Sequence, residues 1–365
     1  MNKSFVFIFV ALLIDFISYS QSDFTTIKVE NHIPGGGDEA YFKSDILYLP
    51  ERKKNGNIFL RKFDCLTQKL TDIYYPPEKF KSAPGFVIDD EFIYFHITQG
   101  IAKVSLETNK IVWEAKYESN YAAQIAPFLH GKYVGIDLDD KIFVLDKITG
   151  DVAVDINEKD LSQSIGFTKD HLIYGKDDGK LIAFDIKKKS KSWKFDVGSD
   201  VGSGCLDLGG KVILPSGDVR IYCVDEKTGS KIWSIEKDEL KASCGSGFNE
   251  VPTLFNNKLY VLQRESGLYE IDKNTGSILS VIKIDDLNDG QLIVYHNHFY
   301  IASTKGFFVY NPSDRSVKKI ADLEVSNNLP SGIQFNGRFL ALNYIGSYST
   351  EPKVLLFDLE KLKRL

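Results

Sequence analysis

The sequence has few of the residues that build metal or redox centres. It contains only four cysteines and six histidines among 365 residues. No two cysteines are spaced as Cys-x-x-Cys, so neither a zinc site nor thioredoxin-like chemistry is supported. An excess of positive charge is also missing, because the net charge is -5 at pH 7. This argues against a nucleic-acid-binding protein, which usually presents a basic patch.

Long apolar runs are missing from all but the N-terminus. There, Met-Asn-Lys precedes the run FVFIFVALLIDFI. We interpret residues 1–20 as a signal peptide that is cut after Ser20, and we expect an exported chain, periplasmic or extracellular. A membrane anchor is the alternative, but the run is shorter than the ~20 residues of a spanning helix. The first cysteine is Cys65, so we expect no lipid anchor, and no other stretch is apolar enough to cross a membrane.

A long amphipathic helical pattern is missing as well, and an internal repeat stands in its place. Apolar strand-like segments end in a small polar residue about every 40 residues. These anchors are Asp64, Ser105, Asp146, Asp185, Asp225, Asp272, Asn311 and Asp358. Thr follows three residues after the anchor at 67, 108, 149, 228 and 275, and Trp follows eight residues after it at Trp113, Trp193 and Trp233.

Each repeat unit is predicted to hold four short strands. Polar pairs such as Asn256-Asn257 lie between two apolar segments upstream of each anchor and indicate a tight hairpin. Eight units of four strands predict an all-β fold, an eight-bladed β-propeller that forms one domain over residues 21–365. The last unit lacks its fourth strand, and we expect residues 23–30 to supply it. Seven blades are the alternative.

The segment Asp-x-x-Thr-Gly between the third and fourth strands has a structural interpretation. The side chains of Asp146, Asp225 and Asp272 are suited to accept hydrogen bonds from backbone N–H groups of the turn. The following Gly supplies a positive φ at little steric cost. We expect the Trp at the start of the fourth strand to cover the edge against a neighbouring sheet. The three aspartates and the three tryptophans, Trp113, Trp193 and Trp233, are therefore predicted to be structural.

The stretch CVDEKTGSKIW (223–233) resembles the tryptophan-docking repeat of the PQQ-like, or quinoprotein, propellers. SLETNKIVW and FDIKKKSKSW match it in part, and the resemblance covers residues 38–365. One branch of this family consists of dehydrogenases that bind pyrroloquinoline quinone and calcium. Its alcohol-oxidising members carry adjacent cysteines, which this sequence lacks, and we see no convincing carboxylate cluster for calcium. We expect no catalytic residue, no metal and no cofactor.

The non-catalytic branch of the family fits the length and the blade count better. It includes outer-membrane assembly lipoproteins, which act as scaffolds. The resemblance therefore implies a monomeric, non-enzymatic scaffold for envelope or outer-membrane proteins. The alternative is a quinone-dependent dehydrogenase, or a propeller that binds a sugar or another small ligand. Connections between successive blades, and between the second and third strands of a blade, are the natural contact sites, and from them we select Tyr121, Asn249, Glu250 and Arg264 as the partner-binding face.

Two further motifs, a pair of cysteines and a run of lysines, each allow two interpretations. Cys205 and Cys244 both lie in Gly/Ser-rich segments, and in an exported chain a disulfide between them is one alternative to free thiols. The run KKKSK at 187–191 falls in a predicted hairpin turn. It is interpreted as a solvated loop, with an anionic contact as the alternative.

Overall fold

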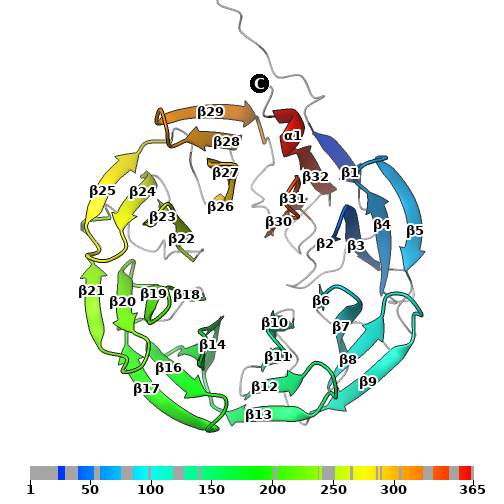
Figure 1. Cartoon of the computed structure of the whole chain (residues 1–365), viewed down its shortest axis with the longest axis horizontal. Coiled ribbons are helices and arrows are strands. Elements are labelled where there is room, and N and C mark those ends of the chain that lie inside the picture. Colours follow the sequence, from blue (N-terminus) through cyan, green and yellow to red (C-terminus); the bar gives the residue numbers. More distant parts are fainter. Residues whose placement is uncertain are drawn as a thin grey trace, which may run out of the picture.

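The chain forms eight four-stranded antiparallel sheets arranged in a ring around one axis (Figure 1). The structure is a computed structural model that describes residues 24–28, 40–52, 58–74, 85–97, 100–117, 127–138, 141–199, 204–236, 238–240, 251–263, 266–284, 287, 290–303, 306–323, 332–344 and 353–362. The prediction of an eight-bladed propeller is confirmed, and the seven-bladed alternative is wrong. The sheets are called blades 1 to 8 below, and in Figure 1 the first strand of each lies nearest the axis.

Blades 1 to 4 follow one another along the chain. Blade 1 consists of β2 (Tyr41–Lys43), β3 (Ile46–Arg52), β4 (Ile58–Asp64) and β5 (Lys69–Tyr74). Blade 2 consists of β6 (Phe86–Ile88), β7 (Phe92–Ile97), β8 (Gly100–Ser105) and β9 (Ile111–Lys116). Blade 3 consists of β10 (Phe128–His130), β11 (Tyr133–Leu138), β12 (Lys141–Asp146) and β13 (Val152–Asn157). Blade 4 consists of β14 (Leu161–Phe167), β15 (His171–Lys176), β16 (Lys180–Asp185) and β17 (Ser190–Asp196).

Blades 5 to 8 repeat the same order, except that the last blade takes one strand from the other end of the chain. Blade 5 consists of β18 (Leu206–Asp207), β19 (Lys211–Pro215), β20 (Ile221–Asp225) and β21 (Lys231–Ile235). Blade 6 consists of β22 (Thr253–Phe255), β23 (Lys258–Gln263), β24 (Gly267–Asp272) and β25 (Ile278–Ile282). Blade 7 consists of β26 (Gly290–Tyr295), β27 (His298–Ser303), β28 (Gly306–Asn311) and β29 (Ser316–Ala321). Blade 8 consists of β30 (Gly332–Phe335), β31 (Phe339–Tyr344), β32 (Lys353–Asp358) and β1 (Thr25–Lys28), and the helix α1 (Leu359–Leu362) follows β32.

Blade 8 joins the two ends of the described chain. β1 pairs antiparallel with β32, with Thr25 opposite Leu356 and Lys28 opposite Lys353. Ile27 is buried in the same core cluster as Leu356. Next to this sheet, the side-chain amide of Asn336 donates a hydrogen bond to the carbonyl of Ser44 in blade 1 at 2.7 Å.

The hydrophobic core lies within the blades and between neighbouring blades. β12 is almost entirely buried, and buried residues of blade 3 and blade 4, such as Val144 and Tyr174, share one cluster. Aromatic rings join further blades, as where Phe255 of blade 6 meets Phe299 of blade 7 edge-on at 5.2 Å. Each sheet buries its faces against its neighbours, so the ring supplies the core that a single sheet lacks.

The strand order gives the ring two different faces. The turns that join the first to the second strand and the third to the fourth strand lie on one face, which we call the turn face. Because the strands are antiparallel, the fourth strand of each blade ends at the opposite face, which we call the loop face. Within the described residues, no helix has the length and apolar character that a membrane crossing requires.

Candidate functional site

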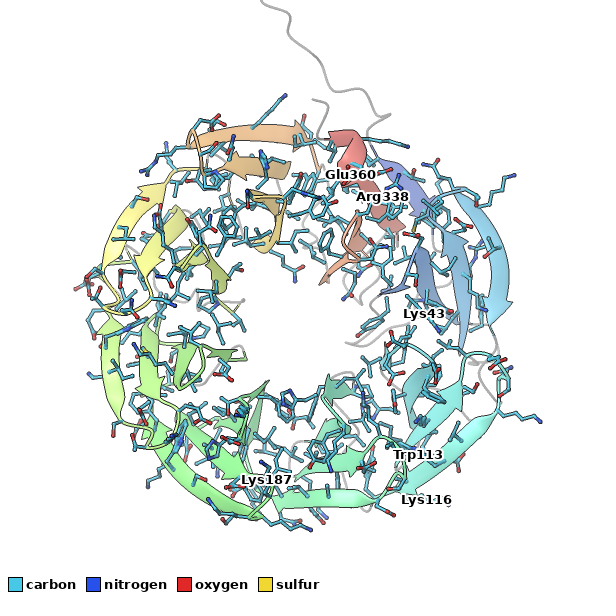
Figure 2. All side chains as sticks on the ribbon, viewed as in Figure 1. Lys43, Trp113, Lys116, Lys187, Arg338 and Glu360 are labelled. Atoms are coloured by element: carbon cyan, nitrogen blue, oxygen red, sulfur yellow. The ribbon has the colours of Figure 1, made fainter. Side chains whose placement is uncertain are left out.

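Three tryptophans connect neighbouring blades through their indole rings. Trp113, Trp193 and Trp233 lie near the start of the fourth strands of blades 2, 4 and 5. Each Nε1–H donates to a carbonyl in the third turn of the next blade, at 3.1 Å to Lys147, 2.7 Å to Glu226 and 3.3 Å to Lys273. Figure 2 shows Trp113 where blade 2 meets blade 3. These hydrogen bonds therefore link blades 2, 4 and 5 to blades 3, 5 and 6, respectively.

The glycine of each receiving turn lies directly under the indole ring. A Cβ added at Gly150, Gly229 or Gly276 would come within 2.7 Å of the ring of Trp113, Trp193 or Trp233. The same three glycines have φ between +69° and +79°. Glycine is thus required at this position for two reasons. The backbone has a positive φ, and the indole ring leaves no room for a Cβ atom.

The aspartate that opens each turn accepts hydrogen bonds from the turn itself. Oδ1 of Asp225 accepts from the backbone N–H groups of Lys227 and Thr228 at 3.1 and 2.9 Å, and from the Thr228 hydroxyl at 2.9 Å. Asp272 has the same three types of partner. The hydroxyl and N–H of Thr228 hold the pKa of Asp225 below its usual value, because they stabilise the carboxylate.

The structure does not describe any of the four residues selected for the partner-binding face. Tyr121, Asn249, Glu250 and Arg264 all lie outside the described residues. The strand ends that flank the first of them, at β9 and β10, lie on the loop face. Their role stays a prediction.

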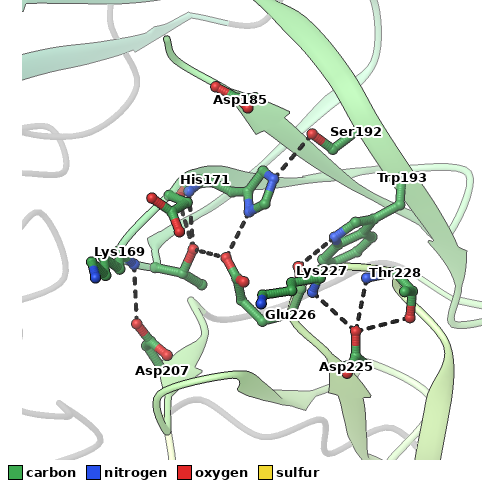
Figure 3. Close-up of polar contacts among 12 residues, drawn as sticks. Lys169, His171, Asp185, Ser192, Trp193, Asp207, Asp225, Glu226, Lys227 and Thr228 are labelled. Carbon is green, nitrogen blue, oxygen red and sulfur yellow. Dashed lines mark hydrogen bonds and ion pairs between the residues drawn. The ribbon is translucent and has the colours of Figure 1, made fainter. Parts of the chain in front are cut away.

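A polar network that is buried except for Ser192 connects blades 4 and 5 beside the docked Trp193 (Figure 3). His171 Nδ1 lies 2.6 Å from Oε1 of Glu226, and that oxygen also accepts from the Thr168 hydroxyl at 2.8 Å. A carboxylate only accepts, so Nδ1 carries a proton, and Nε2 shares a hydrogen bond with Ser192 Oγ at 3.0 Å. The pair His171–Glu226 is less than a tenth exposed. We call these four residues the seam network.

Three residues of the seam network, His171, Ser192 and Glu226, line a hollow of about 700 Å³ on the turn face, which the KKKSK run borders. Most of the lysines in this run are paired with carboxylates. Lys187 lies 3.7 Å from Asp170, Lys188 lies 2.9 Å from Asp185, and Lys191 pairs with Glu158. Their charges are therefore largely balanced within the protein, and the exposed Lys187 matches the interpretation as a solvated loop.

Sequence reasoning missed the seam network, although one signal was present. The residue after the turn aspartate is Lys147 in blade 3 and Lys273 in blade 6, but it is Glu226 in blade 5. An acidic side chain at this position lies close to the docking Trp of the previous blade, and a buried carboxylate needs a hydrogen-bonding or charged partner. His171 supplies that partner from the adjacent blade.

The described part of the chain holds no group of three or more His, Cys, Asp or Glu side chains suited to a metal ion. Cys205 is a free thiol, and Cys244 lies outside the described residues. Burial raises the pKa of Cys205 to about 12, which leaves its thiol protonated at neutral pH.

The sequence matches one protein family over much of its length. Residues 98–286 and 217–320 match the family described as outer membrane protein assembly factor BamB, and these ranges cover more than half of the chain. The chain belongs to this family. Its repeats are thus of the PQQ-like type, as the tryptophan-docking motif indicates. No curated protein is similar enough in sequence to count as a relative.

Solved structures share the fold of this BamB-family chain at low sequence identity. BamB from Moraxella catarrhalis has a TM-score of 0.65 and 12% identity, over 92% of this chain and 98% of that chain. The C-terminal WD40 domain of Sif2 has a TM-score of 0.67 and 12% identity, over 92% and 98%. The computationally designed Ika8 protein has a TM-score of 0.68 and 14% identity, over 91% and 98%. At these identities the likeness establishes the propeller fold and nothing finer.

Proposed function

We propose that this protein is an exported, non-enzymatic scaffold that binds other proteins of the cell envelope. It acts as a monomer and without a cofactor in this proposal. The observation that carries the proposal is the match of residues 98–286 and 217–320 to the family of outer membrane protein assembly factors. The N-terminal apolar run, interpreted as a signal peptide, supports export.

The architecture supports a binding role in physical terms. The Trp contacts and buried seams fix the blades relative to one another, so segments that leave the ring start from a rigid base. On the turn face, the carboxylates of Asp225 and Asp272 accept hydrogen bonds from the backbone N–H groups of their own turns. We therefore assign partner binding to the loop face and to the predicted residues Tyr121, Asn249, Glu250 and Arg264.

Crosslinking in the native host tests this assignment. Tagged full-length protein is crosslinked in intact cells and recovered, and its partners and its mature N-terminus are identified by mass spectrometry. We expect envelope proteins, a chain that begins at Gln21, and loss of the partners when Tyr121, Asn249, Glu250 and Arg264 are all changed to Ala.

The matched control removes exposed side chains from the turn face. Glu107, Lys227 and Asn274 are exposed there, and their joint change to Ala should leave every partner in place. Equal loss in both variants, or recovery of no specific protein from the wild type, would contradict the proposed function.

A further inference from the structure

Among the described residues, the outermost strand of each blade pairs with only one other strand, which leaves its second edge open. An open edge presents unpaired N–H and C=O groups to which another extended chain can add, and proteins usually protect it with charged side chains. Seven of the eight outermost strands contain at least one charged residue within their bounds: β1, β5, β9, β13, β17, β21 and β29. The remaining one, β25 in blade 6, reads ILSVI and contains none.

The side chains of β25 divide into a part that holds the strand and a part that faces solvent. Ile278 and Ile282 pack into the cores on either side of blade 6. Ser280 donates a hydrogen bond to Glu270 of β24 at 3.0 Å. Leu279 and Val281 are 49% and 42% exposed. Figure 1 shows no labelled element outside β25.

We propose that β25 is a docking edge for an extended segment of a partner protein that has apolar side chains at alternate positions. Only an extended backbone can complete the row of hydrogen bonds along this edge. Leu279 is the extra residue of a β-bulge, because Ser280 lies opposite Glu270 while Ile278 lies opposite Ile271. Leu279 and Val281 are both exposed, so apolar side chains of the partner segment would pack on these two residues. This inference rests on the proposed binding function and adds to it a second site, on the rim of the ring, besides the one assigned to the loop face.

A second copy of this chain fits the edge less well than a flexible segment. Stable complexes bury about 1,200 Å² or more. Two copies that meet edge to edge would pair only the five residues of β25 in each chain, whereas a flexible segment can follow the edge and also lay its side chains on the sheet beside it. The partner segment is therefore expected to be extended or disordered before it binds.

Peptide binding to the full chain tests the proposal. The probe is a fluorescein-labelled ten-residue peptide with Val at alternate positions, Thr between them and Lys at both ends, followed by fluorescence anisotropy. We expect binding, slower hydrogen exchange of the amides of 278–282, and an affinity about tenfold lower or worse for the double variant Leu279→Lys/Val281→Lys.

Two controls separate strand pairing from general apolar adhesion. Val152 of β13 is 46% exposed, and its strand already contains Asp155, so Val152→Lys should leave peptide binding unchanged. A peptide that is N-methylated at its four central amides keeps its side chains but loses its backbone donors, and it should not bind. Exposed substitutions of this kind change stability little, which melting curves check.

Three results would overturn the proposal. These are no binding of the unmodified peptide, equal binding of the methylated peptide, and equal binding by the double variant and the wild type. A dimer that the double variant dissolves would assign the edge to self-association instead. If the peptide fails while crosslinking still recovers partners through the loop face, β25 is refuted and the proposed function stands.

Discussion

At the scale of single residues, Gly229 and Gly209 form a matched pair. Their φ values are +69° and +71°, so alanine strains the backbone alike at both. A Cβ at Gly229 would lie 2.7 Å from the ring of Trp193, whereas at Gly209 it would meet nothing within 4 Å. We expect Gly209→Ala to lower the free energy of unfolding by about 1 kcal/mol, and Gly229→Ala to cost a further ~1–3 kcal/mol. Urea-induced unfolding measures both, and equal losses would show that the ring does not constrain the turn.

The turn aspartates predict a defined response to acid. The pKa of Asp225 is lowered in the folded protein, so its stabilising effect is complete above the unfolded value of about 3.9 and is lost as the pH falls toward the folded pKa. We expect Asp225→Asn to be less stable than the wild type at pH 7, and this difference to shrink below about pH 4. The free energy of unfolding between pH 7 and pH 2.5 checks this. Asp90→Asn, at an exposed turn position, is the control, and a difference that stays constant with pH would contradict the assignment.

At the scale of elements, the closing strand β1 carries the clearest prediction. Ile27 is 8% exposed and packs with Val354 and Leu356, whereas Thr26 on the same strand is exposed. Ile27→Ala should lower the free energy of unfolding by about 2 kcal/mol or more, and Thr26→Ala should have little effect. Deletion of residues 21–30 should lower the melting temperature sharply in calorimetry. A deletion variant that melts with the wild type would show that the ring does not depend on β1.

Elements differed in how well the sequence predicted them. The third strands were the most predictable, because a buried apolar run such as Lys141–Asp146 ends at a turn with its own residue signature. The helix Leu359–Leu362 was missed, because one turn is too short for a helical period to appear. The only local sign was Asp358, whose carboxylate accepts the backbone N–H of Glu360 at 3.1 Å.

At the scale of the whole molecule, the period of the repeat predicted the ring. Features that do not recur in every repeat were not predicted. Eight repeats fix the number of blades, since each must bury its faces against the next. The seam network escaped because His171 and Glu226 lie in different repeats, and only the packing of blade 4 on blade 5 brings them together. β25 differs from the other seven outermost strands in having no charged residue within its bounds, a difference that the repeat period does not predict.

The pairing of β1 with β32 also sets an order of events in time. β1 belongs to the first blade-forming residues to be synthesised, and its partner strand belongs to the last. Until β32 has been made, β1 lacks this partner strand, while each earlier blade can already pack on its predecessor. The blades can thus form an open arc before β32 is made, and the pairing of β1 with β32 can only follow it. A chain that is interrupted late therefore leaves an arc with an unpaired strand at its start, which is the kind of edge on which aggregation begins.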